Sequence, residues 1–162
     1  RRQPAAQDLR MIVTIIKMIT DLERIGDEAE KIARMTKLIY SAERLLLPRF
    51  GEIKVAAGYA LEMLKKALDA FARVDITAAA SVVRQDRVRD EQVRGIMRQL
   101  ITFMMEDPRT ISTSIEILFV AKALERIGDH SKNMSEYVVY LVKGKDVRHI
   151  TAEEFERETS SD

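Results

Sequence analysis

The chain has 162 residues, of which 46% are hydrophobic and 33% are charged, with six glycines, three prolines and no cysteine. Its 27 basic and 26 acidic residues leave a net charge of +1, so no global field favours nucleic acid or an anionic membrane as a partner. The absence of cysteine excludes disulfides and thiolate chemistry from this chain, and no apolar run approaches the roughly 20 residues of a membrane span.

The first predicted helix covers about residues 5–41 and contains the hexamer Leu-Glu-Arg-Ile-Gly-Asp at positions 22–27. The same six residues return at positions 124–129, inside the last long helical segment. In each copy a Glu and an Asp stand four positions apart, which places them one turn apart on one helix face. The Gly costs about 1 kcal/mol relative to Ala inside a helix, which indicates close packing or close approach of a ligand.

Two further helices are predicted at about 52–73 and 76–106, with Asp75 as the N-cap of the second. The tight connection between them predicts antiparallel neighbours. The seam of the 76–106 helix advances in steps of three and four, and includes two acidic residues: Ile76, Ala79, Val83, Asp86, Asp90, Val93, Met97, Leu100 and Met104. Burying unpaired carboxylates costs several kcal/mol each. We therefore expect cations beside these two residues, or water at that level of the seam.

The last long helix is predicted at about 109–143, and Gly144 is suited to end it. Its seam reads Val120, Leu124, Ile127, Ser131, Met134, Val138 and Leu141. Residues 145–162 form a polar C-terminal tail that we expect to be largely disordered. Thr151 and Glu154 nevertheless have the spacing of a capping box, which would support a short helix.

These patterns predict an all-α fold without strands. Residues 45–144 form a complete up-down-up three-helix bundle. Because the 5–41 helix matches the last helix, residues 1–44 are interpreted as the last helix of a preceding three-helix repeat that is truncated here. The first helix carries an apolar stripe whose original partners would then be missing. We expect it to pack against the remaining bundle, or to exchange between chains in a dimer or larger assembly.

A candidate metal site follows from the acidic pairs of the complete bundle. Asp86 with Asp90, and Glu125 with Asp129, lie near the middle of antiparallel neighbouring helices, so the pairs can meet at one level. Asn133, one turn beyond Asp129, extends the polar row. Four carboxylates without His or Cys suit Mg, Mn, Ca or iron better than zinc.

The first hexamer offers a matching half-site. Glu23 and Asp27 have the same spacing, but the chain supplies no second pair for them. The plainer alternative is that these acids are helix-surface residues paired with neighbours such as Arg24, Arg126 and Lys132. His130 follows Asp129, but Glu28 occupies the equivalent position of the first copy, so we interpret His130 as a solvated side chain.

The residues that make these patterns closely resemble the PhoU family. The resemblance lies in the repeated hexamer, in Asp86-x-x-x-Asp90, in the run Arg98-Gln99-Leu100-Ile101-Thr102-Phe103-Met104-Met105-Glu106-Asp107, and in the run Val142-Lys143-Gly144-Lys145-Asp146-Val147-Arg148-His149. It covers almost the whole chain. The family has two tandem three-helix bundles, whose Glu/Asp-x-x-x-Asp motifs hold multinuclear iron or zinc clusters in some members. The resemblance assigns Asp86, Asp90, Glu125, Asp129, Glu23 and Asp27 to those motifs.

The resemblance implies a non-enzymatic cytoplasmic regulator of phosphate uptake and of the phosphate-starvation response. Such a protein links a phosphate ABC transporter, through its ATPase subunit, to a sensor histidine kinase, represses the response, reaches the membrane through these partners and forms a homodimer or higher oligomer. One alternative is a carboxylate-bridged metal protein with an enzymatic or metal-handling role, although no Glu-x-x-His pair or other catalytic set is present. The other is a helical scaffold without metal.

Overall fold

The computed structural model describes residues 3–41, 51–144, 146–148 and 150–160. These residues form α1 (Gln3–Ser41), α2 (Gly51–Arg73), α3 (Ile76–Glu106), α4 (Ile111–Lys143), α5 (Ala152–Ser160) and a 3₁₀ turn (Pro108–Thr110). The described residues contain no strand, which confirms the all-α prediction. The expected boundary between residues 44 and 45 lies outside them. None of the helices in these ranges is long and apolar enough to cross a membrane.

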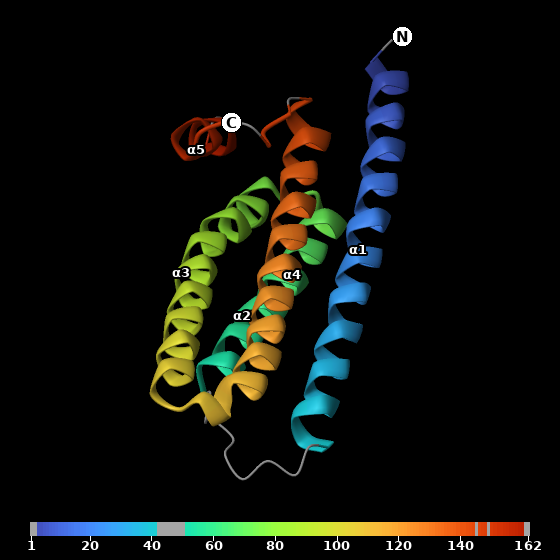
Figure 1. Cartoon of the computed structure of the whole chain (residues 1–162). Helices are drawn as coiled ribbons and strands as arrows, with labels where there is room; N and C mark the ends of the chain where they lie inside the picture. The colour runs from blue at the N-terminus through green and yellow to red at the C-terminus, as the bar shows by residue number, and fades with distance from the viewer. Residues whose placement is uncertain (1–2, 42–50, 145, 149, 161–162) are drawn as a thin grey trace.

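α2, α3 and α4 form an up-down-up bundle, and α1 lies alongside α4 on the side away from α3 (Figure 1). α4 therefore occupies the centre of the described molecule and contacts α1, α2 and α3. The expectation that the first helix packs against the remaining bundle is confirmed, because α1 makes its extensive contact with α4 of the same chain.

The helix ends follow local sequence signals. The Asp75 carboxylate accepts a hydrogen bond from the backbone N–H of Ala78 at 3.0 Å, which caps α3. Gly144 ends α4 in the left-handed region with φ of 70°, where a residue without Cβ is least strained. These signals set where α3 begins and where α4 ends, the two helices that carry the predicted acidic pairs of the bundle.

The bundle core is built on close helix contacts. α2 presents mainly small side chains to its neighbours, and the buried set is Ala56, Ala60, Met63, Ala67 and Ala70. On α4, six of the seven predicted seam residues are buried, and Leu141 is partly buried. Small side chains on α2 leave room for α3 and α4 to approach, which brings the acidic residues of those two helices together.

The buried row of α3 agrees with the predicted seam at Ala79, Asp86, Val93 and Leu100, and elsewhere it is rotated by about one position. The full buried set is Ala79, Ala80, Val82, Asp86, Arg89, Val93, Ile96 and Leu100. Val83, Asp90 and Met97 are only partly buried. The prediction was wrong at these three positions and it omitted Arg89, which the fold buries beside the two acids.

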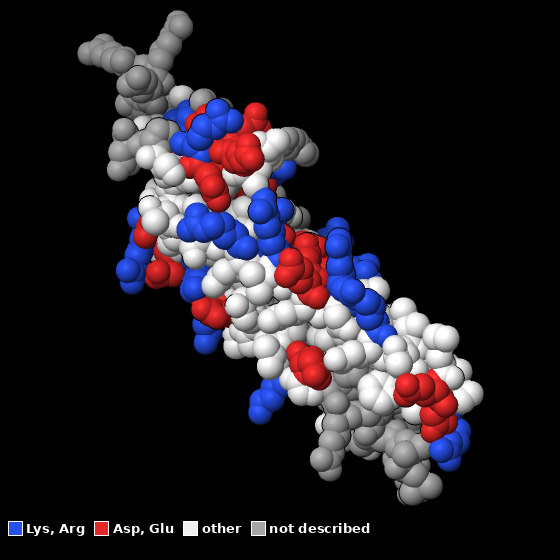
Figure 2. Space-filling view, turned by 90° about the vertical axis from the view of Figure 1, so that its left-hand side faces the viewer, with Lys and Arg blue, Asp and Glu red and all other residues white. Residues whose placement is uncertain are grey.

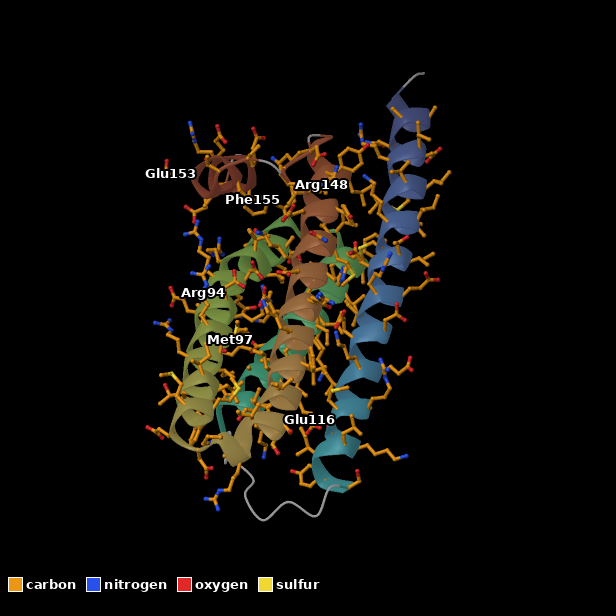
Figure 3. All side chains as sticks on the ribbon, in the orientation of Figure 1. Arg94, Met97, Glu116, Arg148, Glu153 and Phe155 are labelled. Atoms are coloured by element: carbon orange, nitrogen blue, oxygen red, sulfur yellow. The ribbon has the colours of Figure 1, made fainter. Side chains whose placement is uncertain are left out.

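The C-terminal segment differs from the largely disordered tail that we expected. Thr151 and Glu154 form the capping box: the Thr151 N–H donates to the Glu154 carboxylate at 2.8 Å, and the Glu154 N–H donates to the Thr151 hydroxyl at 3.2 Å. Phe155 of α5 points toward the bundle and is 5% exposed, whereas Glu153 points away (Figure 3). One buried aromatic side chain thus attaches the short helix to the bundle.

The surface carries charges of both signs. On the face shown in Figure 2, basic and acidic side chains are interleaved, without a patch of one sign. On α1, the side turned away from α4 is apolar in the first half of the helix, where Leu9, Ile12, Ile16 and Ile19 are exposed.

Candidate functional site

Three aspartates from α3 and α4 meet at the middle of the bundle. Asp86 and Asp90 come from α3 and Asp129 from α4, and one carboxylate oxygen of each lies within 4.8 Å of the others. The helical spacing of four residues brings the first two together, and antiparallel packing brings the third to the same level. In the described part of the chain this is the only such group of potential metal ligands.

The centre of this carboxylate cluster (Asp86, Asp90 and Asp129) is held by the guanidinium of Arg89. Its Nη2 donates to Asp90 at 2.9 Å, to Asp129 at 2.8 Å and to Asp86. Its Nη1 donates to the backbone carbonyl of Glu125. The Arg89 side chain is 0% exposed. A single arginine therefore supplies the compensating cation that two acids in a helix seam require.

Gly128 provides the room for this arginine. A Cβ built on Gly128 would lie 2.7 Å from Cζ of Arg89 and closer still to its Cδ and Nε. Real Cβ atoms essentially never come so close, so with any other residue at position 128 the buried Arg89 side chain would have to shift away from α4. The identical residue of the first hexamer, Gly26, has open space at the same position. The glycine was predicted to mark a close approach, and the structure shows one at Gly128 only.

The charges in the cluster reinforce one another. Burial by itself would lower the pKa of Arg89, but the charges of Asp86, Asp129 and Asp90 raise it above its ordinary value, so the guanidinium stays protonated. The pKa of Asp129 is raised, because partial burial and the neighbouring acids outweigh the attraction of Arg89. The cluster therefore holds a fixed positive charge among three carboxylates.

The other predicted ligands lie outside the cluster. The Glu125 carboxylate is 3.4 Å from Lys122 Nζ, and only the backbone carbonyl of Glu125 reaches Arg89. Asn133 donates weakly to Asp21 of α1 at 3.5 Å. Glu23 and Asp27 are exposed on α1, about half a turn around the helix from Ile25, which is buried against the bundle. The structure thus separates the two hexamers and gives them different surroundings.

A polar joint between α1 and α4 was not predicted. His130 Nδ1 lies 2.7 Å from a carboxylate oxygen of Asp21, which is 6% exposed. The interpretation of His130 as a solvated side chain was therefore wrong. Nearby, Lys17 Nζ of α1 lies 5.4 Å from the ring centre of Tyr137 and 5.8 Å from that of Tyr140. Asp21 and His130 are 109 residues apart in the sequence, so no local spacing could have indicated their contact.

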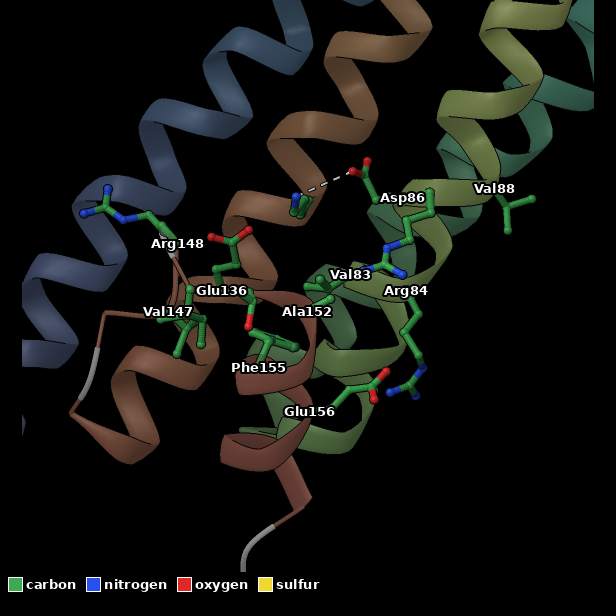
Figure 4. A pocket seen from close by; sticks show the side chains of 14 residues that line it. Val83, Arg84, Asp86, Val88, Glu136, Val147, Arg148, Ala152, Phe155 and Glu156 are labelled. Carbon is green, nitrogen blue, oxygen red and sulfur yellow. Dashed lines mark ion pairs between the residues drawn. The ribbon is translucent and has the colours of Figure 1, made fainter.

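A cavity of about 430 Å³ opens beside the cluster, between α3, α4 and the C-terminal segment (Figure 4). Asp86 lies on its wall, where its second oxygen is 3.7 Å from Lys132 Nζ. Glu136 and Phe155 also line the cavity, and burial raises the pKa of Glu136 to about 7. The Asp86 side chain is mostly buried, but the cavity gives solvent access to it.

The arrangement does not fit a bound metal. A cation held by all three aspartates would need the position between their oxygens, and Nη2 of Arg89 holds that position. Hard dications require oxygen ligands that are free to turn toward them, and each of these aspartates already accepts a charge-assisted hydrogen bond. Metal at Asp86, Asp90, Glu125, Asp129, Glu23 or Asp27 stays a prediction, and the chemistry of the cluster does not favour it.

Comparison with known proteins agrees with the resemblance found in the sequence. The chain matches the PhoU domain family over residues 1–36 and 53–138. It is 49% identical over 151 residues to the phosphate-specific transport system accessory protein PhoU homolog of Pseudomonas aeruginosa, covering 93% of this chain and 62% of the relative. It is 43% identical over 157 residues to the phosphate-specific transport system accessory protein PhoU of Escherichia coli, covering 97% of this chain and 64% of that protein. The chain thus spans less than two thirds of the length of these two relatives.

The fold agrees as well. The crystal structure of PhoU from Pseudomonas aeruginosa matches with a TM-score of 0.83 at 46% identity, covering 90% of this chain and 69% of that one. The phosphate transport system regulatory protein PhoU from Streptococcus pneumoniae matches with a TM-score of 0.79 at 28% identity, covering 87% and 66%. The helical bundle, the repeated hexamer and these matches lead to one conclusion: the chain belongs to the PhoU domain family.

Proposed function

We propose that this chain is part of a non-enzymatic accessory protein of a phosphate-specific transport system. The observation that carries the proposal is the identity of 49% to a relative named for that role, over 93% of this chain. The fold supports it, because the bundle matches a solved PhoU structure along 90% of this chain. Both relatives are named as accessory proteins of a phosphate-specific transport system, and we extend that role to this protein.

The proposed mode of action is that of a cytoplasmic adaptor. The protein binds the ATPase subunit of a phosphate ABC transporter and a sensor histidine kinase, and it represses the phosphate-starvation response when phosphate is plentiful. It reaches the membrane through these partners, as a homodimer or higher oligomer. The mixed charge of the surface suits protein partners better than nucleic acid, because no extended basic patch is present on the face seen in Figure 2.

A chimera tests this proposal. Residues 1–160 of this chain replace the matching region of the Pseudomonas aeruginosa relative in a strain that lacks its own PhoU. We expect the chimera to restore repression of a phosphate-starvation reporter in high phosphate, and to copurify with the transporter's ATPase subunit. The native relative is the positive control for repression and copurification, and an empty vector is the negative control. A folded, expressed chimera that neither represses the reporter nor copurifies with the ATPase subunit would contradict the proposal.

The alternative of a carboxylate-bridged metalloenzyme receives less support. The three aspartates that would bridge the metal already bind Arg89, and the relatives are named as accessory or regulatory proteins. The helical scaffold without metal agrees with the same observations and is compatible with the adaptor role.

A further inference from the structure

The position of Arg89 has a consequence for ion binding. Its side chain is fully buried, yet the cluster around it is open at the edge: the Asp90 and Asp129 side chains are 44% and 52% exposed. Asp86 can be reached from the neighbouring cavity. A small hydrated cation could therefore approach these carboxylates from solvent. Access does not limit metal binding at this site.

Binding of a metal ion is limited by the positive charges beside the carboxylates and by the space that Arg89 fills. Arg89 offsets one of the three negative charges, and Lys132, 3.7 Å from the outer oxygen of Asp86, offsets a second. The guanidinium also fills the point at which a shared ion would sit. It cannot turn away easily, because it is confined against Gly128 and bound to the Glu125 carbonyl. An incoming dication would meet a fixed positive charge in a half-buried site, where the repulsion is stronger than in water.

We propose that Arg89 is the resident cation of the carboxylate cluster and takes the place of a metal ion there, so that Asp86, Asp90 and Asp129 bind a divalent cation only when Arg89 is replaced. Arg89 of α3 joins the two helices through its bonds to Asp129 and to the Glu125 carbonyl of α4, while Asp86 and Asp90 hold it from its own helix. In contrast to a metal, it is permanently present and needs no supply. The bundle therefore closes without metal loading, whatever the function of the whole protein.

Mn²⁺ is the probe for this proposal, since it is a hard cation with oxygen preference and it broadens nearby NMR signals. In Arg89→Met, a shorter apolar side chain replaces the arginine, and Lys132 is left as the one cation that the structure places beside the three carboxylates. We expect this variant to bind Mn²⁺ at least about 10-fold more tightly than wild type in calorimetry, because the positive charge of Arg89 and its occupation of the shared position are removed. Its Tm should rise on addition of Mn²⁺, whereas that of wild type stays constant. Arg94→Met, an exposed position on the same helix, is the matched control and should behave as wild type.

The wild-type chain gives an independent measurement if Arg89→Met fails to fold. On titration with Mn²⁺, the amide signals of residues 86–90 and 125–129 should persist, and slowly rotating guanidinium protons of one buried arginine should remain visible. Selective loss of those signals in wild type would show a metal bound beside Arg89 and would overturn the proposal. A folded Arg89→Met variant that binds Mn²⁺ no better than wild type would also overturn it, since Arg89 would then not be what excludes the ion.

Discussion

The repeated hexamer allows one substitution to be tested in two environments. Gly26 and Gly128 occupy the same place in six identical residues, and both lie within long helices. A Cβ at Gly26 would meet nothing within 4 Å, whereas a Cβ at Gly128 would collide with the side chain of Arg89. We predict that Gly26→Ala stabilises the chain and that Gly128→Ala destabilises it.

The magnitudes follow from helix propensity and from the buried ion pairs. Alanine is better than glycine in a helix by about 0.5–1 kcal/mol, which is the expected gain at Gly26. At Gly128 the same gain is offset by displacement of Arg89, and breaking a buried ion pair costs about 3–5 kcal/mol. The net loss is then roughly 2–4 kcal/mol. For a chain of this size we expect Tm to rise by about 1–4 °C at Gly26 and to fall by roughly 4–16 °C at Gly128.

Thermal unfolding followed by circular dichroism, with urea denaturation beside it, measures both variants. Placing Gly128→Ala in an Arg89→Ala background supplies the control, because the collision is removed and the propensity gain should return. If Gly128→Ala is as stable as Gly26→Ala in the wild-type background, Arg89 is not confined above α4, and the reasoning about the cluster fails with it.

Three further predictions concern other parts of the fold. Burial raises the pKa of Glu136 to about 7, so between pH 4.5 and about 7 the native state keeps a proton that the unfolded state has released. The free energy of unfolding should therefore fall by up to about 3 kcal/mol as the pH rises through this range, which urea denaturation would measure. Asp21→Asn should weaken the joint with His130 and lower the free energy of unfolding by about 1–3 kcal/mol, measured by the same method. Phe155→Ala should release α5, which limited proteolysis would detect as faster cleavage of the C-terminal segment.

Each of these predictions has a matched control. Glu136→Gln should flatten the decline with pH, while the exposed Glu153→Gln should keep it; equal slopes in both variants would refute the assignment. The change at the α1 joint is compared with Glu23→Gln, exposed on the same helix, and equal stability of the two would contradict the structure. Leu61→Ala, at an exposed apolar position, should leave cleavage unchanged, and an unchanged rate in Phe155→Ala would show that α5 is not anchored by that ring.

Helical periodicity was sufficient to predict the all-α fold and most of the α4 seam. The failure on α3 has a physical cause. A buried arginine is unfavourable unless several acids surround it, and one of those acids, Asp129, comes from another helix. The predicted seam therefore did not include Arg89, although its spacing of three residues from Asp86 was a visible signal. A cation beside the acids was one of the two predicted alternatives, water being the other, and the identity of the cation depended on tertiary structure.

The same distinction explains the other differences. His130 lies beside Asp21 only because α1 packs on α4, and the two residues are 109 positions apart. The identical hexamers acquire different roles because α3 covers the acidic face of the second, whereas Glu23 and Asp27 of the first are exposed in the described part of the chain. A sequence repeat predicts equal backbone and equal spacing, but it does not determine which neighbouring helix supplies the opposing side chains.

The attachment of α1 to a single helix also has a consequence for how the chain opens. α4 is enclosed by three helices, whereas α1 is held along one side only. Opening of α1 would expose its contact with α4 while the α2–α3–α4 core stays intact, so its amides should exchange with solvent hydrogen as one cooperative unit at a lower free energy than those of α4. The chain would then unfold in two steps with different free energies of opening. The contacts of Lys17 with Tyr137 and Tyr140 lie between α1 and α4, so the first step would break them.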